Sequence, residues 1–286
     1  MPFTHPLRLE EVLAVLDQRP EATVLAGGTD LMVEINEGRA RPTDLVVAVD
    51  RVAELATWRH DPAAGTVHLG AAVTYTELLR PPLAGLLPAL AQASRTVGSP
   101  QIRNAGTLGG NLATCSPAGD TLPVLAALEA TVHLRSRRGH RDLPVGEFMV
   151  GVKRTALRPG ELIVGVTVPI AHGEQGFAKV GVRNAMVIAV ANACVVLDDR
   201  RRTVAVAVGS VGPTVLRCSD AEQFLTPRLD WATLTATDDD LAAFARLVSE
   251  GARPITDHRS SAEYRRHAVG VLARRIVERS ARQEAA

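Results

Sequence analysis

The sequence lacks the cysteine pattern of a metal-cluster or disulfide-bonded protein. Its three cysteines, Cys115, Cys194 and Cys218, lie far apart, and none belongs to a CxxC pair. A cysteine-ligated iron–sulfur cluster or a structural zinc site within this chain is therefore not expected, and no metal site is predicted. An odd and sparse cysteine count also argues against a disulfide scaffold.

Lysine and net charge are scarce as well. Lys153 and Lys179 are the only lysines among 32 basic residues, and the formal net charge is +1. Such a balance gives no overall field that attracts nucleic acid or a membrane, and the arginines form no block along the sequence. We therefore expect neither kind of partner.

The N-terminal segment has no long apolar run. It carries Glu10 and Glu11, so it resembles neither a signal peptide nor a membrane span, and we expect a cytoplasmic protein. The 286 residues are 46% hydrophobic and 22% charged, which is ordinary globular composition and enough chain for one large domain or two.

The hydrophobic pattern of the first 52 residues predicts a small α/β unit. Residues 4–18 have apolar residues at helical spacing, with Thr4 as the expected N-cap. Short buried strands are expected over 23–26 and 45–49, and a short helix over 31–37 between them.

Strands and helices alternate in the following block, which extends to residue 172. Thr74 and Glu77 have the spacing of a capping box, and one continuous helix is expected over 83–97. Residues 98–120 form a long, polar, glycine-rich segment that we predict to be a loop. The run at 141–148 is expected to be a strand.

The last block, 173–286, has three β-rich runs followed by three helical segments. The second and third runs, 187–197 and 203–211, are joined by a hairpin-like turn. This order predicts an α+β domain in which helices pack on one face of a three-stranded sheet.

Two glycine-dense segments carry the candidate chemistry. They are AGGTD, Ala26–Asp30, and GSPQIRNAGTLGGNLATCSPAGD, Gly98–Asp120. Glycine lets a ligand approach the backbone closely, and successive backbone N–H groups can bind a phosphate. Thr29, Thr107 and Thr114 add hydroxyl donors. Two such segments suit a ligand with two phosphates that is held between two subdomains, which favours a dinucleotide.

Neither segment has the pattern of the commonest nucleotide-binding motifs. GxGxxG after a strand and GxxxxGK[ST] are both absent, so a Rossmann NAD site and a P-loop are not indicated. AGGTD alone is explained equally well as a simple turn. A polar segment as long as 98–120, in contrast, is usually functional in a compact domain.

Longer motifs resemble one known family. They are LAGGTDL, GAAVTYTEL, QIRNAGTLGGNLATCSPAGD, GELIVGVTVP, FAKVGVRNAM and SAEYRRHAVGVLARR, and they span essentially the whole chain. The chain resembles the FAD-binding medium subunit of the molybdenum hydroxylases, the xanthine dehydrogenase and carbon monoxide dehydrogenase family. The resemblance implies an α+β protein with an FAD-binding PCMH-type (vanillyl-alcohol-oxidase-like) domain over 1–172, of two α/β subdomains (about 1–52 and 53–172). A small C-terminal α+β domain, a three-stranded sheet with helices, would cover 173–286.

The resemblance also implies which residues surround FAD. Those on one side of its pyrophosphate would be Leu25, Ala26, Gly27, Gly28, Thr29, Asp30 and Leu31. Those on the other side would be Thr107, Gly109, Gly110 and Asn111. Further cofactor neighbours would be the polar Thr114 and Asp120, the apolar Leu162 and Ile163 beside the flavin, and Lys179 near its ring. Because a carboxylate repels phosphate, we expect Asp30 to point toward neighbouring backbone N–H groups or the ribityl hydroxyls of FAD.

A relay of electrons is the function that the resemblance implies. A small subunit with two [2Fe–2S] clusters would deliver electrons to FAD, a large molybdopterin subunit would oxidise the substrate, and reduced FAD would serve an external acceptor. No catalytic side chain is assigned. Val187 stands where family members often have an acidic residue, which leaves the acceptor open. A stand-alone flavin-dependent oxidase or dehydrogenase, and a binding or assembly protein that has lost FAD, are the alternatives.

Several reactive side chains have simpler explanations. His60, His68, His133 and His140 lie on predicted strands or turns, where histidine is usually a surface residue or a satisfied core residue. Cys115 is expected to be a small filler rather than a reactive thiol.

Overall fold

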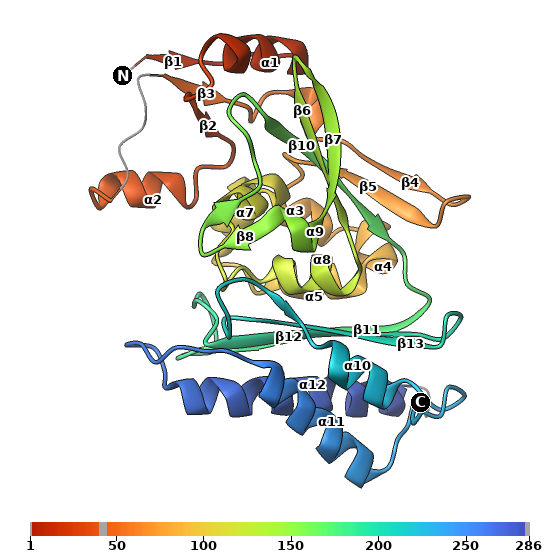
Figure 1. The fold of residues 1–286 in the computed structure, drawn as a ribbon. Helices are drawn as coiled ribbons and strands as arrows, with labels where there is room; N and C mark the ends of the chain where they lie inside the picture. The colour runs from red at the N-terminus through yellow and green to blue at the C-terminus, as the bar shows by residue number, and fades with distance from the viewer. Residues whose placement is uncertain (1, 40–44, 284–286) are drawn as a thin grey trace.

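The computed structural model describes residues 2–39 and 45–283, and its sheets form three layers from top to bottom of Figure 1. The first layer is a parallel sheet of order β1-β3-β2. Its strands are β1 (Phe3–Thr4), β2 (Thr23–Leu25) and β3 (Val46–Ala48), and its helices are α1 (Leu9–Gln18) and α2 (Leu31–Asn36). The predicted α/β unit is therefore present.

Thr4 does not cap the first helix, contrary to the sequence prediction. It lies in β1 and pairs with Val47, and α1 begins only after Arg8, whose side chain makes no capping bond. The helix is held by packing instead, because Val12, Leu13 and Leu16 are buried in one cluster with Val47 and neighbouring residues.

The second layer is an antiparallel sheet of order β4-β5-β10-β6-β7. Its strands are β4 (Trp58–Asp61), β5 (Thr66–Gly70), β6 (Thr131–Ser136), β7 (Gly139–Pro144) and β10 (Leu162–Pro169), preceded by the 3-10 turn η1 (Ala53–Leu55). The other elements of this part are α3 (Tyr75–Leu78), α4 (Leu83–Leu86), α5 (Pro88–Arg95), α6 (Pro100–Ala105), α7 (Leu108–Thr114), α8 (Thr121–Ala127), α9 (Val145–Phe148) and the hairpin of β8 (Met149–Gly151) and β9 (Arg154–Thr155).

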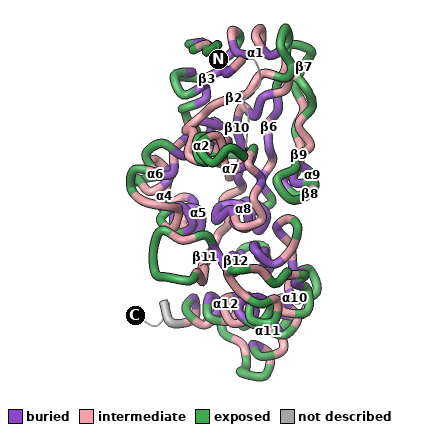
Figure 2. The backbone as a smooth tube through the Cα atoms, turned by 90° about the vertical axis from the view of Figure 1, so that its left-hand side faces the viewer, coloured by how far each residue is buried: buried purple, intermediate pink, exposed green. Residues whose placement is uncertain are grey.

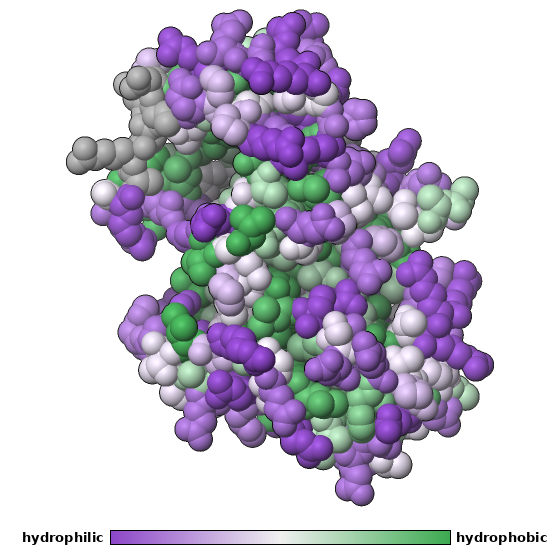
Figure 3. All heavy atoms as spheres, viewed as in Figure 1, coloured by the Kyte–Doolittle hydropathy of each residue, from purple (hydrophilic) through white to green (hydrophobic). Residues whose placement is uncertain are grey.

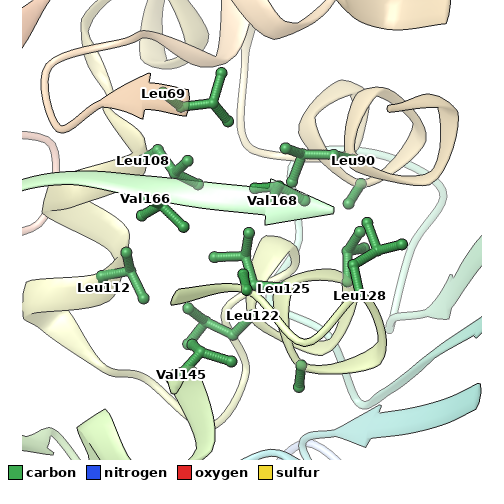
Figure 4. Packing of buried hydrophobic residues seen from close by; sticks show 14 of the residues in the cluster. Leu69, Leu90, Leu108, Leu112, Leu122, Leu125, Leu128, Val145, Val166 and Val168 are labelled. Carbon is green, nitrogen blue, oxygen red and sulfur yellow. The ribbon is translucent and has the colours of Figure 1, made fainter. Parts of the chain in front are cut away.

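The core of this layer lies between β10 and the helices α7 and α8. Figure 4 shows Leu108 and Leu112 of α7, Leu122 and Leu125 of α8, and Val166 of β10 pointing toward one another. All five side chains are buried. Because burying one such side chain contributes roughly 1.5–3 kcal/mol, this cluster fixes α7 firmly against the sheet.

Three predictions in this layer were wrong in detail. The continuous helix over 83–97 is two helices, because Leu87 takes a non-helical conformation immediately before Pro88. The predicted loop over 98–120 contains α6 and α7, which Ser99 and Thr107 cap by accepting the N–H groups of Ile102 and Gly110. The predicted strand over 141–148 ends at Pro144, where α9 follows.

The third layer is an antiparallel sheet of order β11-β12-β13-β14. Its elements are β11 (Gly173–Val180), β12 (Ala191–Asp198), β13 (Thr203–Gly209), β14 (Leu216–Arg217), α10 (Ser219–Leu225), α11 (Asp238–Gly251) and α12 (Ala262–Gln283). The sheet thus has a fourth short strand that the sequence pattern did not predict, and the strand expected to start at residue 187 starts at 191.

Both faces of this sheet are covered, although the sequence predicted helices on one face. Figure 1 shows α10, α11 and α12 below it and α5 and α8 above it. Every residue of β12 is buried as a result. Phe177 and Cys194 belong to the same buried cluster as Leu90 and Leu125, so apolar contacts run across the expected domain boundary at 172/173. That boundary stays a prediction.

Arg265 of α12 binds the backbone just before β12 and just after β13. Its side chain is 2% exposed. One guanidinium nitrogen donates to the carbonyls of Val190 (2.9 Å) and Ser210 (3.1 Å), and the other donates to Asp257 Oδ1 (2.6 Å). The arginine therefore satisfies two backbone carbonyls beside β12 and β13 that have little access to water.

We expect Arg265→Ala to lower the free energy of unfolding by about 3 kcal/mol, because it leaves two buried carbonyls without their donor and removes one of the two arginines that bind Asp257. Urea denaturation measures this loss. The neighbouring Arg266 is exposed, so Arg266→Ala is the matched control and should change stability by less than about 0.5 kcal/mol. Equal effects of the two substitutions would contradict the role given to Arg265.

No helix in the described part of the chain combines the length and the apolar character that a bilayer span needs.

Candidate functional site

A cavity lies where the first and second layers meet. Both glycine-dense segments line it, together with parts of the chain that follow β5 and precede β10. Its volume is about 170 Å³. That is less than the roughly 300–1,000 Å³ of typical ligand clefts, so a dinucleotide would extend from it over the neighbouring surface.

The structure brings most of the predicted site residues together. The predicted residues that line the cavity are Leu25, Ala26, Gly27, Gly28, Thr29, Asp30, Leu31, Thr107, Gly109, Gly110, Asn111, Thr114, Leu162 and Ile163. Asp120 and Lys179 do not line it.

Gly27 allows the first segment to lie against the second. A Cβ at this position would be 1.8 Å from the carbonyl oxygen of Ala105, the last residue of α6. No side chain fits there, so Gly27 is needed for contact between two backbones and not only for access of a ligand. Gly28 has φ +70°, a left-handed conformation that favours glycine and turns the chain into α2.

The turn formed by Gly28, Thr29 and Asp30 leaves backbone donors free. Among the described residues, the N–H groups of these three positions have no hydrogen-bond acceptor. They lie side by side in the chain and line the cavity. Successive free N–H groups in a concave turn are a suitable arrangement for binding an anion such as a phosphate.

The second segment offers different groups. The N–H groups of Leu108, Gly109 and Gly110 already donate to Val73 O (3.0 Å), Ala71 O (2.8 Å) and Thr107 Oγ1 (3.0 Å). A second set of free backbone donors, which the glycine pattern predicted, is therefore absent from these three positions. What this segment offers a ligand is open space and side chains.

Gly110 leaves space in the cavity, and Asn111 supplies a side-chain donor. A Cβ on Gly110 would meet only Thr107 Oγ1, at 2.9 Å, and nothing else within 4 Å. Asn111 accepts from Thr121 Oγ1 at 2.6 Å, which orients its amide and leaves the Nδ2 donor without a partner in the described chain.

Asp30 and Thr114 join the two segments directly. Thr114 Oγ1 donates to Asp30 Oδ2 at 3.0 Å. The carboxylate thus contacts the facing segment and not the neighbouring backbone N–H groups, which were one of the two expected partners; the other, the ribityl hydroxyls of FAD, stays a prediction. This bond gives a structural reason for an acid directly after the two glycines.

Asp120 and Lys179 form a buried pair between the second and third layers. Lys179 Nζ donates to Asp120 Oδ2 (2.5 Å) and to the carbonyls of Thr96 (2.9 Å) and Val187 (3.1 Å). Asp120 also accepts from Thr96 Oγ1 and from Asn192 Nδ2. Burial raises the pKa of the Asp120 carboxyl, while Lys179 opposes that shift. All three donors of Lys179 are used within the chain. Because Lys179 belongs to the third layer and Asp120 and Thr96 belong to the second, the pair connects the two layers.

Tyr75 and Glu161 line the cavity, although the sequence did not assign them to the site. Tyr75 is buried, its hydroxyl has no hydrogen-bond partner in the described chain, and burial with the nearby Asp30 holds its pKa far above the usual range. Glu161 accepts two bonds of 2.7 Å from Arg141, which lowers the pKa of its carboxyl. Both residues lie in motifs quoted above, GAAVTYTEL and GELIVGVTVP, which was the available signal.

The other reactive side chains have ordinary surroundings. His133 contacts Asp142 Oδ1 and Thr167 Oγ1, each at 2.7 Å, and burial lowers the pKa of the neighbouring His68. Cys115 is buried, and burial raises the pKa of its thiol, so it is a poor nucleophile.

The comparisons with known proteins show the family of this chain. Residues 1–171 match the family described as the FAD binding domain in molybdopterin dehydrogenase. The chain belongs to this family. Residues 177–280 match the CO dehydrogenase flavoprotein C-terminal domain. The cofactor of the FAD-binding domain family is FAD, and the fold is the expected one, an FAD-binding domain followed by a small C-terminal domain.

Individual members of the family are similar over different lengths. The nicotinate dehydrogenase FAD-subunit of Eubacterium barkeri is 38% identical over 66% of this chain and 65% of its own length. The 6-hydroxypseudooxynicotine dehydrogenase complex subunit alpha of Paenarthrobacter nicotinovorans is 32% identical over 96% of this chain and 90% of its own length. A chain of the reconstituted CO dehydrogenase from Oligotropha carboxidovorans superposes with a TM-score of 0.89 at 28% identity, over 99% of this chain and 98% of that one.

We expect Gly27→Ala to destabilise the FAD-free protein by about 1–3 kcal/mol, because the added methyl overlaps the carbonyl of Ala105. Urea denaturation of the apoprotein measures this effect apart from cofactor binding. Gly85→Ala is the control, since nothing lies within 4 Å of a Cβ on Gly85 of α4. A Gly27→Ala apoprotein as stable as the wild type would show that the two segments do not touch.

Proposed function

We propose that this chain is the cytoplasmic FAD-binding subunit of a molybdenum hydroxylase complex and relays electrons from [2Fe–2S] clusters of a small partner subunit to an external acceptor. A large molybdopterin subunit would oxidise the substrate. Support comes from the family to which the chain belongs and from relatives named as subunits of dehydrogenase complexes.

The observation that carries the proposal is the row of free N–H groups at Gly28, Thr29 and Asp30, which lines the same cavity as Gly110. This combination suits a pyrophosphate, because one phosphate group has room at Gly110 and can accept from the turn opposite. The donor set of the cavity therefore fits FAD.

The remaining residues around the cavity have distinct proposed roles. Leu25, Ala26, Gly27 and Leu31 shape the first side of the pyrophosphate site, while Thr107, Gly109, Gly110, Asn111 and Thr114 shape the second side. Leu162 and Ile163 would lie beside the flavin and exclude water from it. Asp120 and Lys179 remain predicted neighbours of the flavin ring.

The protein contributes position and surroundings rather than a reacting side chain. When bound, FAD supplies the redox chemistry, as a carrier between one-electron and two-electron partners. Tyr75 stays protonated at neutral pH, since its pKa lies far above the usual range, and it can donate a hydrogen bond into the cavity. Glu161 is held by Arg141 and carries a fixed negative charge at the cavity wall.

Purification of the tagged chain from its native host tests the relay. We expect it to be recovered with an iron–sulfur protein and a molybdopterin protein, with iron and molybdenum detected by metal analysis. Recovery of the chain alone, with FAD and with turnover of an organic substrate, would contradict the relay and favour a stand-alone flavin-dependent oxidase or dehydrogenase.

We expect Gly110→Val to reduce the FAD content of the purified protein at least about tenfold, because its side chain fills space that we assign to the pyrophosphate. Flavin absorbance near ~450 nm relative to protein concentration measures the content. Gly146→Val is the control, since Gly146 is exposed and a Cβ there meets nothing within 4 Å. Full flavin content in a folded Gly110→Val protein would refute the assignment of the second segment.

A further inference from the structure

A second and larger groove lies between α6, the loop that joins β11 to β12, and α12. Its volume is about 940 Å³. Five arginines line it, namely Arg95, Arg103, Arg183, Arg275 and Arg279. They come from distant parts of the sequence, which is why no block of arginines is visible along the chain. We call this feature the arginine groove.

The positive charge of the arginine groove is not neutralised within the described chain. No aspartate or glutamate lines the groove. Arg103 donates to the carbonyls of Val97 and Gly98, and Arg95, Arg275 and Arg279 have neither an ion pair nor a hydrogen bond from their side chains among the described residues.

Many arginines elsewhere in the described chain form ion pairs with acids. Arg141 binds Glu161, and Arg217 binds Glu222, each through two bonds of 2.7–2.9 Å. Lys179 also lines the arginine groove, but Asp120 neutralises it. Because the whole chain has a net charge of only +1, this local excess is a specific feature and not a consequence of composition.

Exposed apolar side chains stand beside these charges. Val182, Met186 and Ile188 of the β11–β12 loop are 64%, 56% and 61% exposed, and Tyr264 at the start of α12 is 48% exposed. Figure 2 shows the loop as an exposed segment that extends from β11 below α6. Figure 3 shows a further mixture of apolar and polar residues across the middle of the face seen in Figure 1.

Hydrogen bonds within the loop hold it in shape. Arg183 donates from Nε to the carbonyls of Ala185 (3.0 Å) and Met186 (3.2 Å), and Nη2 also contacts the latter oxygen. A loop that is already held in shape loses less conformational freedom on binding. Arginine, tyrosine and methionine beside apolar residues are the composition of protein interfaces rather than of bare surface.

We propose that the arginine groove is the docking site for a carboxylate-rich segment of a partner subunit, an inference that rests on the complex proposed above. Charge complementarity selects an acidic segment. The spread of the guanidinium groups over several elements, and the exposed apolar residues beside them, suit a polypeptide better than a small anion. The overall charge of +1 gives no wider field for nucleic acid.

Charge reversal in the intact complex tests this docking site. The triple variant Arg95→Glu, Arg275→Glu and Arg279→Glu changes exposed residues that have no partner in the described chain, so we expect it to fold and to retain FAD. Its affinity for the partner subunit should fall at least about 100-fold, because like charges then face each other. Pull-down of co-expressed subunits, with FAD content measured in the same samples, gives both quantities.

The matched control reverses three exposed arginines away from the groove. Arg19→Glu, Arg51→Glu and Arg137→Glu lower the net charge by the same amount, and we expect full assembly. If the groove variant assembles as well as the wild type, the docking site is refuted while the proposed complex stands. If the wild-type chain assembles with no partner, the proposed complex fails first and the docking site fails with it.

A cross-linking experiment avoids any loss of charge. Lys153 contacts Glu34 and Lys179 is buried against Asp120, so the chain has few amines for carbodiimide coupling to foreign carboxylates. Arg275→Lys adds one amine in the groove. We expect carbodiimide to join it to an aspartate or glutamate of a partner subunit in the purified complex, and to give no such product with Arg137→Lys. Cross-links within the chain alone would overturn the proposal.

Discussion

The two glycine-dense segments meet where no side chain fits, and the candidate site depends on this contact. The backbone at Gly27 lies so close to Ala105 that a Cβ would overlap its carbonyl. With the first segment held there, the turn at Gly28, Thr29 and Asp30 lines one cavity with the second segment, and Asp30 accepts a hydrogen bond from Thr114. The cavity is thus a product of close backbone packing, and the proposed pyrophosphate site depends on that packing.

The third layer is connected to the site through buried polar and apolar contacts. Lys179 and Asn192 both bind Asp120, which directly precedes α8, and α8 packs on the sheet that contains Lys179 and Asn192. The β11–β12 loop is therefore connected to the second glycine segment through few bonds, since Lys179 binds both Asp120 and the carbonyl of Val187. A partner in the arginine groove would contact this loop, which places partner binding and the cofactor site in one connected part of the molecule.

The sequence predicted the two segments, their ligand class and the three-part order of the fold, because glycine density and long family motifs are local signals. It missed features that depend on contacts between distant residues. Helices α6 and α7 are too short to show a long apolar period, and the caps Ser99 and Thr107 mark where they begin. The bond between Asp30 and Thr114, the use of the second segment's N–H groups by Ala71 and Val73, and the gathering of arginines in one groove all require the tertiary fold.

We propose above all that the free N–H groups of Gly28, Thr29 and Asp30 bind the pyrophosphate of FAD opposite Gly110. A crystal structure of the FAD-bound protein tests it most directly. We expect pyrophosphate oxygens about 2.7–3.2 Å from these backbone nitrogens, with the bond between Thr114 and Asp30 intact. A pyrophosphate bound elsewhere, with these nitrogens in contact only with solvent, would contradict it.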